Sequence, residues 1–157
     1  MRSKEKKIPP SNTFFKSILA GVEIHNEGVR DMKKILLVED DLDVQKVLSE
    51  YFLLKTPYKV YTAEDGEVAL DIVKNDPPDF IILDVILPKI NGLAFIRYLR
   101  KIKNAGNIPV ILMSGEMVDD GIKREGLSLG VVDYLLKPMN LEDLLATVNS
   151  YLSPETQ

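Results

Sequence analysis

The sequence predicts an α/β fold, a doubly wound sheet of five parallel strands with helices on both faces. Short apolar runs alternate along the chain with longer segments whose apolar residues recur at helical spacing. Such alternation requires parallel strands joined by right-handed crossovers. The strand runs are apolar at nearly every position, as expected for a sheet covered on both faces. This pattern is regular from residue 33 onward.

The first strand is predicted at residues 35–38, which are uniformly aliphatic. Asp41 follows it and can cap a helix, because a short carboxylate accepts hydrogen bonds from the free N–H groups of a first turn. Pro57 ends that helix, and residues 58–62 are predicted to form a second, more exposed strand. The inward face of the helix is predicted to carry Val44, Val47, Leu48, Tyr51 and Phe52.

A second helix is predicted at residues 64–75, and the prolines at 77 and 78 stop it because proline cannot continue a helix. Residues 80–83 read as the third strand. After a loop at 88–92, residues 93–103 are predicted to form the third helix. The inward face of the second helix is predicted to carry Val68, Ala69, Ile72 and Val73.

The fourth strand is predicted at residues 109–113, and a weak helix follows at 117–129. Gly121 and Gly126 weaken that helix, at roughly 1 kcal/mol each relative to alanine. Gly130 closes it, since glycine readily adopts the conformation that ends a helix.

The fifth strand is predicted at residues 132–136, and Asn140 is predicted to cap the last helix, residues 141–152. Periodicity alone does not determine the strand order. The length and rhythm of the elements suit the flavodoxin-like order 2-1-3-4-5.

Polar side chains follow four of the predicted strands. Glu39 and Asp40 follow the first strand, Asp84 the third, Ser114 the fourth and Lys137 the fifth. The C-terminal ends of parallel strands meet at one edge, where open α/β sheets bind ligands, so we expect one shared site. Carboxylates suit Mg²⁺, while a lysine and a hydroxyl suit a phosphoryl group.

Each of these residues also has a simpler interpretation. Asp40 and its neighbour are ordinary helix caps when taken alone, Ser114 reads as a turn residue, and Lys137 as a solvated lysine. Asp84 is harder to explain this way, because its charge lies between two apolar stretches. The joint placement at one sheet edge favours a site. Gly92 and Gly115 are expected to leave the adjoining loops able to move.

Four stretches carry a resemblance that spans residues 33–153. Together they resemble the receiver domains of two-component response regulators, the family of the chemotaxis regulator. This resemblance implies a phosphorylation-operated switch with a flavodoxin-like sheet. The matching stretches are residues 35–41, 83–92, 110–115 and 133–138.

The resemblance implies a role for each residue of the predicted site. Asp84 matches the phosphoacceptor, Ser114 and Lys137 match the groups that bind the phosphoryl group, and Tyr134 matches the switch aromatic. The peptide bond after Lys137 is implied to be cis. The ligands implied for Mg²⁺ are Glu39, Asp40, Asp84 and the backbone carbonyl of Ile86.

Residues 1–31 differ in composition from the rest of the chain. They carry six basic and four acidic residues, against fourteen basic and twenty acidic in the remainder. We expect an N-terminal extension that is flexible or holds one short helix, followed by a receiver domain at 33–153 and a tail at 154–157. His25 is expected to be exposed to solvent. The apolar face of the helix would carry Phe14, Ile18 and Val22.

The expected function is that of a single-domain response regulator that accepts a phosphoryl group on Asp84 with Mg²⁺ and switches a protein-binding surface. Its expected partners are a sensor histidine kinase or histidine phosphotransfer protein and a downstream effector protein. The alternatives are a phosphorelay intermediate and a receiver that acts as a scaffold without switching. Phosphatases that use an aspartate nucleophile carry it after the first strand, which disfavours that class here.

Composition narrows the remaining classes. The net charge of -4 disfavours direct nucleic-acid binding. The absence of cysteine excludes disulfides and thiolate chemistry. No apolar run is long enough to span a bilayer, so we expect a cytoplasmic protein without membrane insertion. It is expected not to be an enzyme, apart from catalysing its own phosphorylation and dephosphorylation.

Overall fold

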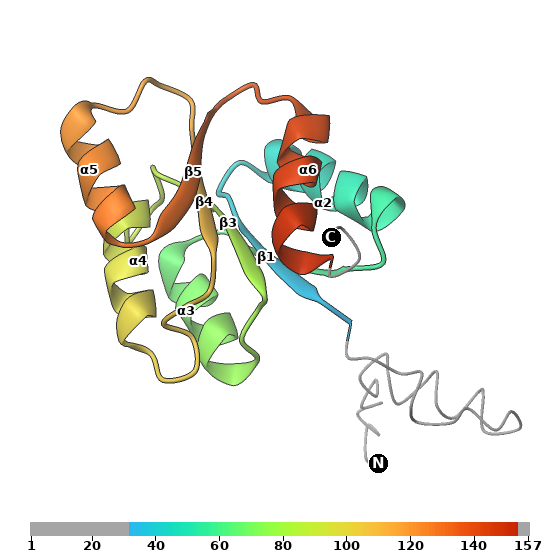
Figure 1. Ribbon diagram of the computed structural model, residues 1–157, viewed down its shortest axis with the longest axis horizontal. Coiled ribbons are helices and arrows are strands. Elements are labelled where there is room, and N and C mark those ends of the chain that lie inside the picture. Colours follow the sequence, from blue (N-terminus) through green and yellow to red (C-terminus); the bar gives the residue numbers. More distant parts are fainter. Residues whose placement is uncertain (1–31, 154–157) are drawn as a thin grey trace, which may run out of the picture. The chain divides into compact units, whose positions relative to one another are not determined.

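The structure is a computed structural model that describes residues 32–153. The predicted helix with Phe14, Ile18 and Val22, together with His25 and the tail at 154–157, lies outside these residues. Within them strands alternate with helices (Figure 1). The strands are β1 (Lys34–Val38), β2 (Lys59–Ala63), β3 (Phe80–Asp84), β4 (Val110–Ser114) and β5 (Val131–Leu136). The helices are α2 (Leu42–Lys55), α3 (Gly66–Asn75), α4 (Gly92–Lys101), α5 (Asp120–Ser128) and α6 (Leu141–Leu152).

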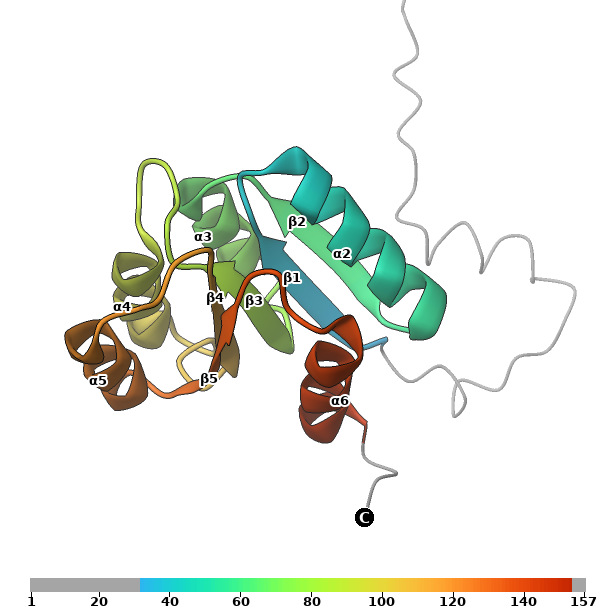
Figure 2. The same cartoon turned by 90° about the horizontal axis from the view of Figure 1, so that it is seen from above.

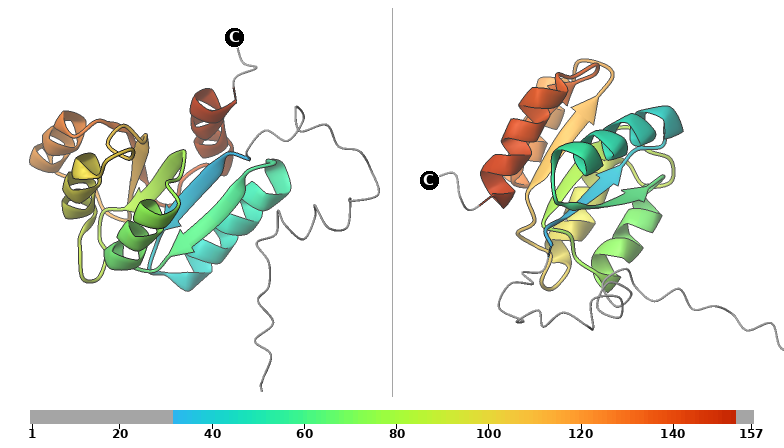
Figure 3. Two further views of the ribbon diagram at one scale, coloured as in Figure 1. Left: turned by 90° about the horizontal axis from the view of Figure 1, so that it is seen from below. Right: turned by 90° about the vertical axis from the view of Figure 1, so that its right-hand side faces the viewer.

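The strands form one parallel sheet in the order β2-β1-β3-β4-β5, which confirms the predicted order. Helices α2 and α6 cover one face of the sheet, and α3, α4 and α5 cover the other (Figures 2 and 3). None of the helices in residues 32–153 is long and apolar enough to cross a membrane.

The core divides into two layers because side chains alternate across each strand. In β1, Leu36 and Val38 pack under α3 and α4, whereas Ile35 and Leu37 pack under α2 and α6. Strands β3 and β4 repeat this period of two, and every residue of both is buried. Neighbouring residues of these strands therefore point into opposite core layers, and both must be apolar. This explains the continuous apolar runs in the sequence.

Each described helix begins with an Asp or Asn side chain that accepts a hydrogen bond from a first-turn N–H group. The predictions for Asp41 and Asn140 are confirmed. Asp41 accepts from Asp43 at 2.9 Å, and Asn140 accepts from Glu142 at 2.9 Å. The remaining caps are Asp65, Asn91 and Asp119.

Some details of the predicted helices are wrong. The helical spacing predicts Val47 and Val68 on inward faces, but they are 57% and 42% exposed. Each lies one residue before a buried position, and the 100° turn between neighbouring helical residues carries it off the narrow stripe that the sheet covers. The weak helix begins at Asp120 rather than at residue 117, because Asp119 acts as its cap.

Strand β5 is the irregular edge of the sheet. Val110 of β4 pairs with Val131, but the next residue, Ile111, pairs with Asp133. The skipped residue makes a bulge, which bends a strand and redirects the side chains that follow it. Tyr134 and the end of β5 take their orientation from this point.

Candidate functional site

Three carboxyl groups converge at the C-terminal edge of the sheet. Val38 pairs with Leu83, so the ends of β1 and β3 lie side by side. Glu39, Asp40 and Asp84 each place an oxygen within 4.8 Å of the other two. Glu39 and Asp84 are buried, at 1% and 5% exposure, whereas Asp40 is exposed. The structure thus brings together the acids that the sequence predicts to share a site.

Lys137 reaches this acidic cluster from the end of β5. Its Nζ lies 2.7 Å from Oε2 of Glu39 and 2.5 Å from Oδ2 of Asp84. Its backbone N–H donates to the carbonyl of Ser114 at 2.7 Å, and the following peptide bond is cis. Burial works to lower the pKa of the Lys137 ammonium, but its hydrogen bonds to the two carboxylates raise that pKa overall. The lysine therefore stays charged.

The Glu39 carboxyl has a strongly displaced pKa. Burial raises the pKa of Glu39 to about 7; the hydrogen bond from Lys137 opposes this rise, and the Asp84 carboxylate adds to it. The cluster holds more negative charge than one lysine neutralises. A negatively charged site with several carboxylate oxygens fits Mg²⁺, which prefers oxygen ligands and keeps several waters. Exposed Asp40 leaves one side open to solvent.

Asp84 is fixed by the loop that follows it. The N–H of Ile86 donates to Oδ1 of Asp84 at 2.9 Å. A Cβ on Gly92 would lie 2.7 Å from the carbonyl oxygen of Asp84 and 2.9 Å from Cα of Val85. Gly92 therefore permits a close approach of two backbone segments, whereas the expected movement of the loop stays a prediction. Gly115 has no atom within 4 Å of such a Cβ.

The loop after β3, residues 85–91, also contacts α3 and its cap through residues that the sequence pattern does not reveal. Lys89 Nζ lies 3.2 Å from Oδ2 of Asp65 and 3.6 Å from Oε2 of Glu67. A Cβ on Gly66 would lie 2.8 Å from Cβ of Ile90. These partners lie on different elements, so spacing along the chain gives no signal for them.

Ser114 is near the acids but is not bonded to them. Its hydroxyl donates to the carbonyl of Glu116 at 2.7 Å and accepts from the Glu116 N–H at 3.2 Å. Tyr134 lies farther out, where its hydroxyl donates to the carbonyl of Ile122 at 2.9 Å. An open cavity of about 180 Å³ lies between these two side chains, lined by the loop after β4, by α5 and by β5.

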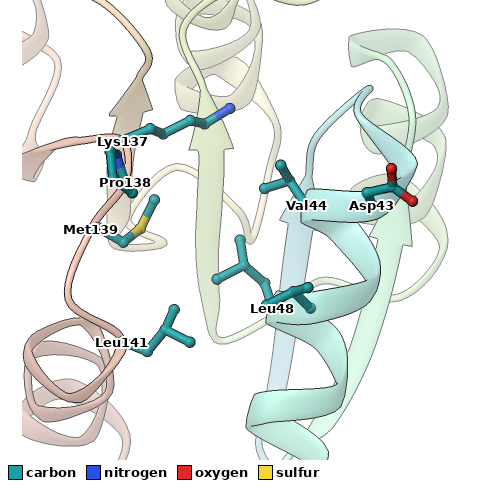
Figure 4. Close-up of a pocket in the computed structure, with 8 residues that line it drawn as sticks. Asp43, Val44, Leu48, Lys137, Pro138, Met139 and Leu141 are labelled. Atoms are coloured by element: carbon teal, nitrogen blue, oxygen red, sulfur yellow. The ribbon is translucent and has the colours of Figure 1, made fainter.

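A second, more apolar hollow of about 470 Å³ opens beside Lys137 (Figure 4). It lies between α2 and the segment that joins β5 to α6, and Val44 and Leu48 face Met139 and Leu141 across it. We name it the α2–α6 groove. Its upper end holds Asp43 and Lys137, so the groove leads to the acidic cluster.

Comparison with known proteins gives a consistent family. The model of the response regulator receiver domain matches residues 35–149. The alkaline phosphatase synthesis transcriptional regulatory protein PhoP of Bacillus subtilis is 38% identical over 120 residues, covering 76% of this chain and 48% of PhoP. The chain spans about half the length of several curated relatives that it matches.

Solved structures show the same fold. Chemotaxis protein CheY4 of Vibrio cholerae superposes with a TM-score of 0.70 at 32% identity, covering 77% of this chain and 99% of CheY4. The receiver domain of a sensor histidine kinase from Pseudomonas aeruginosa, solved with a magnesium ion in its active site cleft, gives a TM-score of 0.69 at 27% identity. That match covers 77% of this chain and 98% of the domain.

Proposed function

Because this chain belongs to the response regulator receiver domain family of two-component systems, we propose that it accepts a phosphoryl group on Asp84 with Mg²⁺ and switches a protein-binding surface. One observation carries the proposal: Asp84 is buried at a strand end between two further acids and a charged lysine. A carboxylate in that setting becomes a usable nucleophile once cationic groups neutralise the incoming charge.

The proposed reaction is a transfer from a phosphohistidine donor. An oxygen of Asp84 attacks phosphorus, and the N–P bond of the donor breaks. The electron pair of that bond stays on the imidazole nitrogen, and the imidazole takes up a proton from solvent. Lys137 already contacts the attacking carboxylate at 2.5 Å, so its charge is in place for the transferred group. Glu39, Asp40 and Asp84, with the proposed Ile86 carbonyl, would hold Mg²⁺. When bound, Mg²⁺ supplies positive charge that offsets the charge of the phosphoryl oxygens.

Ser114 is the proposed second ligand of the phosphoryl group. Its hydroxyl must turn away from the carbonyl of Glu116, to which it now donates at 2.7 Å. The new acceptor is an ionised oxygen, and hydrogen bonds to ionised groups are stronger than neutral ones. Phosphorylation is therefore proposed to move the loop after β4, and this movement would couple the site to the face formed by α5, β5 and α6.

The donor is proposed to be a helical protein, a sensor histidine kinase or a histidine phosphotransfer protein, that docks along the α2–α6 groove. Along α2, Val44, Val47, Tyr51 and Leu54 recur at the three- and four-residue spacing of a helix-packing seam. Val47 and Leu54 are exposed. Because the groove leads to Lys137, a helix lying in it can bring its histidine to Asp84.

The proposed output is binding of an effector protein to the α5–β5–α6 face, where Leu127, Leu136 and Tyr151 are exposed. In this proposal the protein catalyses only its own phosphorylation and dephosphorylation. A phosphorelay intermediate would use the same Asp84 but pass the group to a second histidine protein. A scaffold would take up no phosphoryl group, so the two alternatives separate in one assay.

The assay follows the intact mass of the full chain with acetyl phosphate and Mg²⁺. Wild type should gain the mass of one phosphoryl group, and EDTA should prevent the gain. Asp84→Asn should gain nothing while keeping its far-ultraviolet circular dichroism. Asp71→Asn is the matched control, because Asp71 is an exposed acid on α3 away from the site. Uptake by Asp84→Asn, or uptake in EDTA, would contradict the proposal.

A further inference from the structure

The ring of Tyr134 fills the space that a side chain on Gly126 would need. Gly126 lies within α5, and a Cβ on it would overlap the hydroxyl oxygen of Tyr134 and lie 2.7 Å from its Cζ. No L-residue with a side chain can occupy position 126 while the phenol stays where it is. The sequence identifies Gly126 only as a residue that weakens the helix. The structure shows that its missing side chain makes room for Tyr134.

The phenol of Tyr134 packs against α5 at the place where Gly126 has no side chain. The Tyr134 hydroxyl lies 2.9 Å from the carbonyl of Ile122 and 3.3 Å from the carbonyl of Lys123. These carbonyls belong to the helical turn just before Gly126. Burial raises the pKa of the Tyr134 hydroxyl, and the charge of Glu125 adds to the rise, so the group remains a donor. We name this surface, made by Ile122, Lys123 and Gly126, the glycine notch.

A second place for the ring lies next to the notch. The cavity of about 180 Å³ is lined by Tyr134 itself, by Lys123 and by Ser114 and Glu116 of the loop after β4. A ring turned into this cavity would leave the carbonyls of α5 and lie against the loop that carries Ser114. The tyrosine therefore has one occupied position on α5 and one open space toward the proposed phosphorylation site.

We propose that Gly126 is a positioning residue that sets the resting state of the switch, because its notch binds Tyr134 to α5 and away from the Ser114 cavity. This inference rests on the proposed function. Any ligand that moves the loop after β4 must also offset the contacts in the notch, and it can shift the equilibrium only by its differential affinity for the two positions. A side chain at position 126 removes the resting position and leaves the ring to the cavity or to solvent.

The first test is a thermal double-mutant cycle without phosphorylation. In a Tyr134→Ala background, Gly126→Ala should raise the unfolding midpoint by about 3–5 °C, since alanine favours a helix over glycine. With Tyr134 present, the same change should lower the midpoint, because the ring loses its position. Gly121→Ala in the same helix is the control. Its Cβ would meet only Asp119 Oδ1, at 3.1 Å, so its effect should be the same in both backgrounds.

The second test reads the tyrosine directly by carbon-13 NMR of the Tyr134 Cζ atom, assigned by its loss in Tyr134→Phe. In wild type this carbon should titrate above the ordinary tyrosine range, and in Gly126→Ala it should titrate lower. Tyr134→Phe, which keeps the glycine, should by itself shift the amide signals of residues 122–126. An equal rise in midpoint in both backgrounds, with an unchanged Tyr134 titration, would overturn the notch.

The third test adds Mg²⁺ and beryllofluoride, a mimic of the acyl phosphate. Wild type should show amide shifts in α5, and Gly126→Ala should show smaller ones, because its ring is already released. Shifts of equal size in the two proteins would refute the notch as a control of the switch. No response in wild type would refute the proposed function instead, while the first two tests would still decide whether the notch holds Tyr134.

Discussion

Strands β3 and β5 end at the same edge of the sheet but are built in opposite ways. All residues of β3 are buried, and it lies between β1 and β4. In β5 only Val131 is buried, and a bulge interrupts its pairing with β4. The chain places Asp84 on the first strand and Tyr134 on the second. The buried central strand holds the proposed phosphoacceptor, and the edge strand holds the residue proposed to move.

The loops after the strands continue this contrast. After β3, Gly92 packs against the backbone of Asp84, and Lys89 pairs with Asp65, the cap of α3. After β4, a Cβ on Gly115 would have no neighbour within 4 Å, and the Ser114 hydroxyl bonds to the backbone of Glu116 in its own loop. Segments with few buried contacts open at lower free energy than the core. We therefore expect mutational effects to differ sharply between the two regions.

The largest stability difference should come from one matched leucine pair. Leu83→Ala in β3 removes a fully buried side chain and should cost about 2–5 kcal/mol of unfolding free energy. Leu136→Ala in β5 removes a side chain that is 53% exposed, so it should cost about 0.5 kcal/mol or less. Urea unfolding followed by circular dichroism measures both. Equal costs would mean that the edge strand is as firmly packed as the centre.

Lys137 links the two regions, because it leaves β5 and binds Asp84 of β3. Lys137→Met keeps the length of the side chain but removes its charge. Loss of one preorganised charge should slow phosphoryl uptake from acetyl phosphate roughly 10²–10³-fold. Lys46→Met, on the exposed side of α2, is the control and should leave the rate unchanged. Similar rates in the two variants would exclude Lys137 from the transfer step.

The glycines after β3 and β4 offer a sharper comparison of the loops. Gly92→Ala forces a Cβ against backbone atoms at 2.7 and 2.9 Å and should cost about 1–3 kcal/mol. Gly115→Ala meets open space and should be within about 0.5 kcal/mol of wild type. Thermal unfolding of both variants checks this. A costly Gly115→Ala would show that the loop after β4 is constrained by its backbone conformation.

The sheet was predictable because burial on both faces leaves a direct record in the sequence. Uninterrupted apolar runs in β1, β3 and β4 determine two core layers, and each polar residue that follows marks a strand end. Helix bounds were less predictable, as Val47, Val68 and the start of α5 show. Periodicity reports which residues are apolar, but the width of the covered stripe depends on the neighbouring elements.

The site was predictable in its members more than in its contacts. The meeting of Glu39, Asp84 and Lys137 follows from strand order, since three strand ends share one edge. The bonds of Ser114 with Glu116, and the fit of Tyr134 against Gly126, depend on rotamers and on a bulge that no local pattern encodes. The roles of these residues and the domain bounds at 33 and 153 remain predictions.

The last comparison concerns Glu39, which follows β1 beside β3 and binds Lys137 at the end of β5. Its pKa of about 7 in the folded state exceeds the ordinary glutamate value, so the folded protein binds this proton more tightly than the unfolded chain. Stability from this group is present at low pH and is lost as pH rises through about 7. In metal-free buffer the unfolding free energy should therefore fall between pH 5 and pH 8, on the order of 1–3 kcal/mol.

Glu39→Gln tests the cause of that slope. The amide mimics the protonated acid and can still accept from Lys137, so the metal-free variant should lose the slope and exceed wild type in stability at pH 8. Mg²⁺ should reverse the ranking there, because a ligand that binds only the folded state stabilises it and the variant lacks one anionic ligand. Wild type should also gain more from Mg²⁺ at pH 8 than at pH 6, where the proton on Glu39 competes with the ion. Urea unfolding at both pH values, with EDTA or excess Mg²⁺, measures each term. If Glu39→Gln kept the same pH dependence of the unfolding free energy, another group would cause that dependence. The proposed protonation of Glu39 would then be contradicted.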